Sequence, residues 1–157
     1  MIRNAIRHRP EDAALKDILL LIRKCFAYMD GRIDPPSSMH RLTEAAIARQ
    51  CQSGEVWSLE EPIRACVFLT PKDDCLYLGK MAVDSEARGL GLGRSLVALA
   101  EERARALGYH ALELETRIEL VENHKIFASF GFVKTAETAH EGYDRMTSIT
   151  MRKAVAG

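Results

Sequence analysis

The sequence predicts an α/β (α+β) domain with a mixed, mostly antiparallel sheet of about seven strands and helices on both faces. Segments that alternate apolar and polar residues, as half-buried strands do, occur on both sides of a long segment with helical spacing. The strand–helix–strand order over 75–116 is typical of a crossover connection, while the closely spaced strands before and after it favour hairpins. The 157 residues suit one domain with a substantial core.

The composition excludes several classes of protein. Lys and Arg total 22, as do Asp and Glu, so a zero net charge does not favour nucleic acid or an acidic membrane as partner. The 47% apolar content is too high for a disordered chain, and the longest apolar run, Ile18–Ile22, is too short to span a bilayer. The N-terminal residues lack the apolar stretch of a secretory signal, so we expect a cytoplasmic protein.

The cysteines and histidines do not predict a metal site. No C-x-x-C pair occurs, and no cysteine has a histidine at zinc-ligand spacing. We therefore expect no metal, and thiols that are reduced and mostly buried.

The first part of the chain predicts a short strand and two helices. The strand is expected at 2–8. Acidic residues after Pro10 suit a helix start, and apolar residues keep helical spacing through 11–29. A second helix is expected from about 43 to 51, with Thr43 as its N-cap.

The rest of the chain alternates between the two patterns. A hairpin turn is expected at Glu61-Pro62 and a helix from Leu92 to Leu107 that stops at Gly108. A shorter helix is expected over 120–130. The six predicted strands of this part lie at 55–60, 63–70, 75–84, 110–116, 132–139 and 146–152.

The junction between the strand at 75–84 and the long helix carries the most informative motif, Arg88-Gly89-Leu90-Gly91-Leu92-Gly93. Glycine lets a backbone approach a ligand closely, because no Cβ stands in the way. A helix start adds free N–H groups and the positive end of the helix dipole. With Arg88 and Arg94 on either side, the segment predicts a cradle for a pyrophosphate.

The spacing distinguishes three phosphate-binding motifs. A P-loop requires a lysine that is absent here, and a G-x-G-x-x-G fingerprint would need its third glycine at Leu96 or Arg94. The spacing that fits is R-x-x-G-x-G. This is the acyl-CoA signature of the GCN5-related N-acetyltransferase (GNAT) superfamily, which the chain resembles also in the order of its predicted helices and strands.

The resemblance implies that residues 1–157 form a single acyl-CoA N-acyltransferase (GNAT) domain whose two central strands splay apart. It implies acetyl-CoA as co-substrate and direct transfer of the acetyl group to a primary amine of a small molecule or peptide. Many relatives dimerise through their C-terminal strands, so a homodimer is also compatible with it. The cofactor-binding residues that it implies are Met81, Ala82, Val83, Arg88, Gly89, Leu90, Gly91, Leu92, Gly93, Arg94, Ser95 and Asn123.

The chain departs from the family at the position of the usual general acid. In Phe127-Ala128-Ser129-Phe130-Gly131-Phe132, which looks like the family's Y-E-K-L-G-F segment, the tyrosine is replaced by Phe127. The family's usual asparagine falls on Leu120, three residues before Asn123. Direct transfer still needs proton transfers, so other groups must supply them. The candidates are Glu115 as general base and His124, Tyr143 or Tyr77 as further proton-transfer groups.

The resemblance also implies that the segment 28–41, between the first two predicted helices, covers the acceptor pocket. This segment contains two prolines, which would reduce the entropy lost on ordering, and the polar residues that we assign to substrate binding: Arg32, Asp34, Ser37 and His40. Asp34 with Glu115 would favour a cationic amine, whereas Arg32 with Arg117 would favour an acceptor with a carboxylate. The sequence does not choose between them.

Two other functions compete with acetyl transfer. Because Phe127 has no transferable proton, the chain could be a catalytically weak acyl-CoA-binding regulatory module. A nucleotide-phosphate enzyme of P-loop type is more remote. Binding of acetyl-CoA but not ATP would exclude the latter, and release of CoA thiol with an amine would exclude the former.

Overall fold

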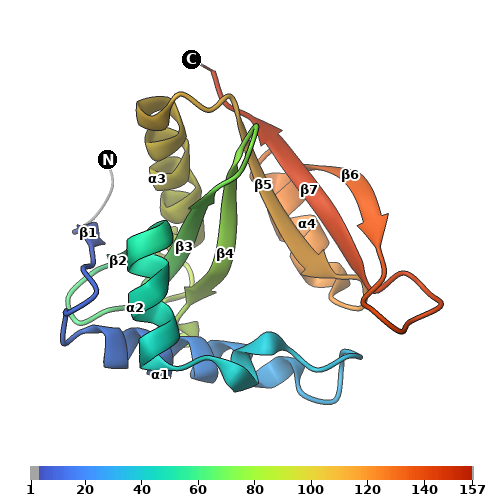
Figure 1. The fold of residues 1–157 in the computed structure, drawn as a ribbon, viewed down its shortest axis with the longest axis horizontal. Helices are drawn as coiled ribbons and strands as arrows, with labels where there is room; N and C mark the ends of the chain where they lie inside the picture. Colours follow the sequence, from blue (N-terminus) through green and yellow to red (C-terminus); the bar gives the residue numbers. More distant parts are fainter. Residues whose placement is uncertain (1–3, 157) are drawn as a thin grey trace.

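The computed structural model describes residues 4–156 and contains a seven-stranded sheet, four α-helices and three 3₁₀ helices within that range (Figure 1). The strands are β1 (Ile6–Arg7), β2 (Glu55–Leu59), β3 (Ala65–Pro71), β4 (Leu76–Val83), β5 (Ala111–Arg117), β6 (Val133–Thr138) and β7 (Ser148–Ala154). The helices are α1 (Leu15–Phe26), η1 (Ala27–Met29), η2 (Ser38–Arg41), α2 (Glu44–Ser53), η3 (Ser85–Ala87), α3 (Leu92–Leu107) and α4 (Val121–Ser129).

The sheet has the order β1-β2-β3-β4-β5-β7-β6, which confirms the predicted fold class. All neighbouring strands are antiparallel except β4 and β5, which are parallel and are connected by α3. Figure 1 shows β4 and β5 diverging from one end of the sheet to the other, so the predicted splay of the central strands is also confirmed.

Two apolar cores cover the two faces of the sheet. One packs α3, Phe127 of α4 and the following Phe130 and Phe132 against the central strands, and Leu96 and Leu112 are fully buried in it. The other packs α1 and α2 against β2, β3 and β4, around Ile18, Ile22 and Ile47. The side chains with helical spacing in the sequence are therefore those that the helices bury.

Several element ends differ from the prediction. The predicted strand at 2–8 is only Ile6–Arg7 among the described residues, and its first two positions lie outside them. The helix predicted over 11–29 begins at Leu15, because the carboxylate of Asp12 accepts a hydrogen bond from the backbone of Ala14 (2.9 Å) and forms a turn before it. Its last turn continues as η1.

Other local predictions agree with the structure. Thr43 caps α2, because its hydroxyl accepts a hydrogen bond from the backbone N–H of Ala46 at 3.1 Å. The four cysteines are free thiols, of which Cys66 and Cys75 are buried and Cys25 and Cys51 half-buried. No helix within residues 4–156 is both long and apolar enough to cross a membrane.

A buried carboxylate holds α3 on the sheet. Glu55 of β2 is 4% exposed and accepts two hydrogen bonds from the guanidinium of Arg103, at 2.8 and 2.6 Å. The indole N–H of Trp57 donates a third at 2.7 Å. Burial alone would raise the pKa of Glu55, but these hydrogen bonds outweigh it and lower that pKa. The helix that follows the glycine motif is thus anchored by charge as well as by its apolar face.

We expect Arg103→Ala to reduce the free energy of unfolding by about 3 kcal/mol, because it leaves the buried Glu55 carboxylate without its main partner. Chemical denaturation would measure this. Arg105→Ala is the matched control, since Arg105 is an exposed residue of the same helix. Equal losses in the two variants would contradict the anchoring role of Glu55 and Arg103.

Candidate functional site

The candidate site is a cavity of about 1600 Å³ between the diverging halves of the sheet. Strands β4 and β5 pair only at Leu76↔Leu112 and Tyr77↔Glu113, and no further pairing joins them in the described part of the chain. From residue 78 onward, the edge of β4 that faces β5 therefore presents free backbone groups to the cavity. Backbone N–H and C=O groups need partners, so this edge can bind an extended ligand.

The glycine motif borders one end of this cavity. Gly89 and Gly91 have positive φ angles of 87° and 75°, which a residue with a side chain adopts only at a cost. An added Cβ would meet no atom within 4 Å at either position, so the space in front of both glycines is open. Glycine is therefore favoured at positions 89 and 91 by the positive φ angles, and not by a lack of space for a side chain.

The start of α3 offers hydrogen-bond donors to that open space. Helix α3 begins at Leu92 after Gly91, and no side chain of the described residues caps it. The first N–H groups of a helix have no partner within it, so those of Leu92, Gly93 and Arg94 remain available. The N–H of Ser95 is already used, because it donates to the carbonyl of Gly91 at 3.0 Å. Such a helix start is suited to binding an anion.

Some motif residues have a structural role. A Cβ at Gly93 would lie in van der Waals contact with the ring of Phe130, at 3.4 Å, and the guanidinium of Arg94 stacks over the same ring. Leu92 is buried in the core, whereas Arg88 and Leu90 are exposed. The side chains of this segment thus build the junction, while its backbone faces the cavity.

The predicted β4 segment, Met81-Ala82-Val83, lines the cavity next to a β-bulge. The pairing with β3 shifts there, and Lys80 has a positive φ of 48°. From α1, the thiol of Cys25 donates a hydrogen bond to the carbonyl of Val83 at 3.3 Å. The bulge turns the Lys80 side chain out of the regular alternation of the strand.

On helix α4, the position of the family's usual general acid is occupied by Phe127, and its surroundings are apolar as well. Phe127 lines the cavity and packs edge-on against the buried ring of Phe132, with the ring centres 6.1 Å apart. Asn123, one turn earlier on α4, also lines the cavity and donates to the hydroxyl of Tyr28 at 3.2 Å. Sequence reasoning missed Tyr28, whose phenol reaches α4 from a segment that lies 95 positions away.

The four predicted proton-transfer candidates lie in different environments. Glu115 lines the cavity, is exposed, and has no ion-pair or hydrogen-bond partner for its carboxylate among residues 4–156. His124 is not in the cavity lining, and its Nε2 lies 2.9 Å from the carbonyl oxygen of Arg117. The Tyr143 hydroxyl donates to Asp34 at 2.6 Å, and this hydrogen bond raises the pKa of Tyr143. Burial, and then the charge of Glu115, raises the pKa of Tyr77.

The predicted acceptor residues divide into two groups. Arg32 and Ser37 line the cavity, but Arg32 forms a bidentate ion pair with Glu122 at 3.0 and 2.8 Å. Asp34 and His40 are not in the lining and hold the loop together instead, with His40 bonded to Asp30 at 2.7 Å. The structure therefore does not bring the four side chains to one point.

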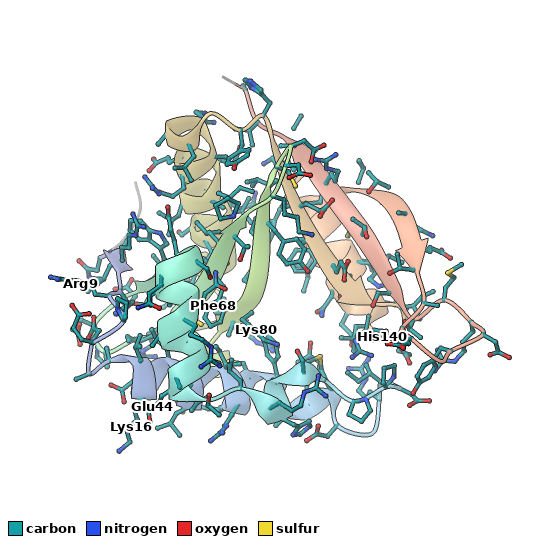
Figure 2. The ribbon with its side chains drawn as sticks, viewed as in Figure 1. Arg9, Lys16, Glu44, Phe68, Lys80 and His140 are labelled. Atoms are coloured by element: carbon teal, nitrogen blue, oxygen red, sulfur yellow. The ribbon has the colours of Figure 1, made fainter. Side chains whose placement is uncertain are left out.

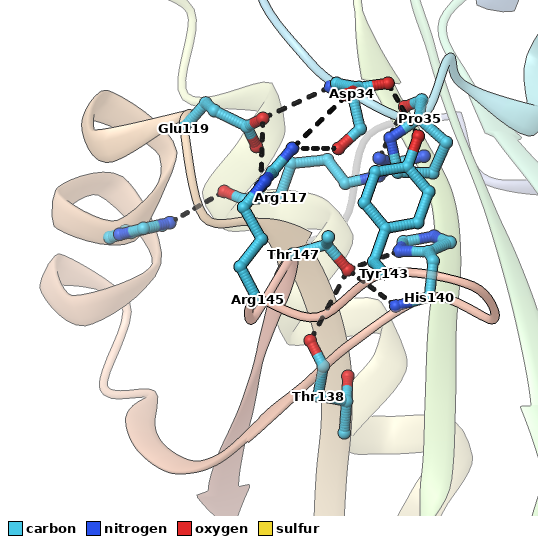
Figure 3. Close-up of polar contacts among 10 residues, drawn as sticks. Asp34, Pro35, Arg117, Glu119, Thr138, His140, Tyr143, Arg145 and Thr147 are labelled. Atoms are coloured by element: carbon cyan, nitrogen blue, oxygen red, sulfur yellow. Dashed lines mark hydrogen bonds and ion pairs between the residues drawn. The ribbon is translucent and has the colours of Figure 1, made fainter.

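The loop that contains Asp34 is joined to the loop between β6 and β7 (Figure 3). Besides the Tyr143 hydroxyl, the guanidinium of Arg145 contacts Asp34, at 3.0 Å from its carbonyl and 3.4 Å from its carboxylate. Glu119 accepts from the backbone N–H of Asp34 at 3.1 Å. The two loops thus cover one side of the cavity as a connected unit.

Three cationic side chains lie together near these loops, and the sequence analysis did not predict that they would be neighbours. Lys80, Arg41 and Arg117 all line the cavity, and the ammonium of Lys80 donates to the hydroxyl of Ser38 at 2.7 Å. Burial, followed by the charges of Arg117 and Arg41, lowers the pKa of Lys80. Figure 2 shows Lys80 where β4 meets the region of α1 and the following loop. A lysine inside the apolar strand pattern LYLGKMAV is the signal that could have revealed it.

Comparison with known proteins identifies the family. Residues 16–132 match the model of the Acetyltransferase (GNAT) family, and the chain belongs to this family. The resemblance deduced from the glycine motif is thereby confirmed. No curated protein sequence matches the chain.

Solved structures share the fold at low sequence identity. A GNAT-family acetyltransferase from Staphylococcus aureus aligns with a TM-score of 0.73 at 14% identity, covering 97% of this chain and 99% of that one. Ard1 from Thermoplasma volcanium aligns with a TM-score of 0.71 at 19% identity, covering 98% and 99%. A GNAT-family acetyltransferase from Elizabethkingia anophelis, with acetyl-CoA bound, aligns with a TM-score of 0.65 at 18% identity, covering 96% and 97%.

Proposed function

We propose that this protein transfers the acetyl group of acetyl-CoA to a primary amine of a small molecule or peptide by direct transfer. The observation that carries this proposal is the uncapped start of α3 behind two glycines of positive φ, next to an unpaired β4 edge in one cavity. The acetyl-CoA held by the neighbour from Elizabethkingia anophelis, which has the same fold, supports it.

The parts of the site suit the parts of this co-substrate. The N–H groups of Gly89 and of Gly91 to Arg94 would hold the pyrophosphate, whereas those of Leu90 and Ser95 are already bonded to the carbonyls of Ala87 and Gly91. The backbone of Met81, Ala82 and Val83 would pair with the pantetheine arm along the free edge of β4. Acetyl-CoA supplies an acetyl group that is activated as a thioester.

Glu115 is the proposed general base. Its exposed carboxylate lies on β5 in the cavity and is free of partners among the described residues. It would accept a proton from the amine as the amine nitrogen bonds to the acetyl carbon and the carbon–sulfur bond breaks. The neighbouring Glu113 is unsuited to this role, because it is paired with Lys72 at 3.0 Å.

Tyr28 is the proposed proton donor to the departing sulfur in place of Phe127. Its hydroxyl accepts a hydrogen bond from Asn123, so its own proton remains available to another acceptor. Asn123 lies one helical turn from Phe127, which places the Tyr28 phenol beside the position of the usual acid. Tyr143 and His124 are less suited, because both are engaged in loop contacts.

A regulatory module that binds acyl-CoA without turnover is the second candidate. The observation in its favour is the apolar packing of Phe127 against Phe132 where an acid is usual. This candidate and the enzyme share the cradle, so binding alone does not separate them.

We expect acetyl-CoA, but not ATP, to raise the melting temperature, because a ligand that binds only the native state stabilises it. We also expect release of CoA thiol with at least one amine of a broad library. Thermal shift and a thiol-reactive dye measure the two effects. Stabilisation by ATP alone would overturn the proposal, and tight acetyl-CoA binding without thiol release for any amine would favour the module.

We expect Gly91→Asp to raise the Kd for acetyl-CoA at least tenfold, since its carboxylate would repel the pyrophosphate at the helix start. Gly108→Asp is the matched control, because Gly108 ends the same helix with a φ of 84° and equal open space. Both variants should lose about 1 kcal/mol of stability through backbone strain. Calorimetry should find weaker binding for Gly91→Asp alone; equal affinities in the two variants would remove this segment from the binding site.

We expect Glu115→Gln to lower kcat about 10²-fold and to flatten the acidic limb of the pH–rate profile, because the base is lost. Tyr28→Phe should lower kcat with little change in the KM for acetyl-CoA. Glu113→Gln serves as the control and should keep the wild-type profile. An unchanged profile in Glu115→Gln would show that Glu115 is not the base.

A further inference from the structure

The acceptor side of the cavity, meaning the part lined by Ser38, Arg41, Lys80, Glu115 and Arg117, carries an uneven distribution of charge. Three of these five residues are cations, contributed by η2, β4 and β5. The inference drawn from them rests on the proposed function, because it concerns the amine that the same site would accept.

The positive charge of Lys80 is not balanced by the protein. Its ammonium bonds to a neutral hydroxyl, that of Ser38, and forms no ion pair with any carboxylate within residues 4–156. The side chain is half-buried, and the guanidinium groups of Arg41 and Arg117 lie close enough to destabilise its charge further. Bringing like charges together in a partly desolvated place is unfavourable, and a bound anion would relieve it.

Two of the ionic residues that the sequence assigns to acceptor binding, Arg32 and Asp34, are already paired. Arg32 is held by Glu122, so it does not compete for an anion. The carboxylate of Asp34 is held by Tyr143 and Arg145, and Asp34 is not in the cavity lining. These contacts engage one residue of each pair that left the acceptor open in the sequence, so Glu115 and Arg117 are the members that remain.

Glu115 is the one carboxylate among the five residues that define the acceptor side. Glu115 has no partner among the described residues and projects from β5, two residues before Arg117. The cavity lining also includes Glu141, which belongs to the exposed loop between β6 and β7. A ligand that satisfies both kinds of free group must carry a positive and a negative charge close together.

We propose that the acceptor is an amino acid, that is, an amine that carries a carboxylate. Its ammonium group would lie at Glu115, and its carboxylate would be bound by Lys80 and Arg117, with Arg41 closing from η2. Arg117 already donates to the carbonyls of Pro35 (2.6 Å) and Pro36 (3.1 Å), and Lys80 donates to Ser38. The N–H groups that remain on these side chains can donate to the two oxygens of a carboxylate.

The test measures thiol release with matched acceptors. The probes are free α-amino acids and their α-amides, β-alanine and 4-aminobutyrate with their amides, and 2-aminoethyl phosphate. The proposal expects kcat/KM to be at least about tenfold higher for a carboxylate than for its amide, since a charge-assisted hydrogen bond is lost in the amide.

Variants assign this preference to the cations. Lys80→Gln should raise the KM for the carboxylate acceptor at least about tenfold, abolish the preference over the amide, and leave the KM for acetyl-CoA unchanged. Lys72→Gln is the matched control, because Lys72 is a half-exposed lysine of the same face that is paired with Glu113. It should keep the preference. If Lys80→Gln lowers the melting temperature, Arg41→Gln provides a second test of the same site, because Arg41 is exposed and its replacement should not disturb the fold.

Three results would overturn the proposal: amides that react as well as acids, a preference that survives both Lys80→Gln and Arg41→Gln, or a stronger preference for the phosphate. If no amine causes release of CoA thiol, the proposed acetyl transfer is wrong, but the anion site can still be tested.

That test is calorimetry on the CoA-bound protein with N-acetylglycine and N-acetylglycinamide. Tighter binding of the acid, lost in Lys80→Gln, supports the site, and equal binding overturns it.

Discussion

The separation of β4 from β5 is the constraint on which the rest of this structure depends. Two parallel strands that pair at only two positions leave much of their facing edges without backbone partners. Inside a protein such edges are unfavourable unless solvent or a ligand satisfies them. The cavity that results places the free edge of β4, the start of α3 and the side chains of β5 around one space. The backbone edge of β4 and the side chain of Glu115 on β5 face this space because the strands do not continue to pair.

Much of the fold and the backbone geometry of the glycine motif could be predicted because their causes are local. A period of two or 3.6 residues follows directly from backbone geometry, so the strands and α3 were visible in the pattern of apolar residues. The glycines at 89 and 91 report backbone angles that other residues avoid, which is again a property of adjacent positions. Element ends were less predictable, as the turn formed by Asp12 before α1 illustrates.

The acceptor side could not be predicted, because its charges are paired across long separations in sequence. Arg32 and Glu122 are 90 positions apart, and Tyr143 and Asp34 are 109 apart. No spacing rule connects such residues, so the sequence could not show which ionic groups are already satisfied and which remain free. Lys80 and Glu115 stand out only once the pairs around them are known. The same reasoning applies to Tyr28, whose position beside α4 depends on how the first helix crosses the sheet.

Because the two covering loops are bonded to each other and not to the start of α3, changes in the acceptor region can occur independently of changes in the proposed pyrophosphate site. Asp34 joins the loop after α1 to the loop between β6 and β7, and neither loop contributes to the helix start that faces the proposed pyrophosphate. Substitutions in the loops can therefore reshape the part of the cavity that selects the acceptor while the cradle stays as it is. Because one carboxylate serves both loops, however, a change at Asp34 alters both together. A lineage that exchanges one loop for a new specificity is thus expected to exchange the other as well.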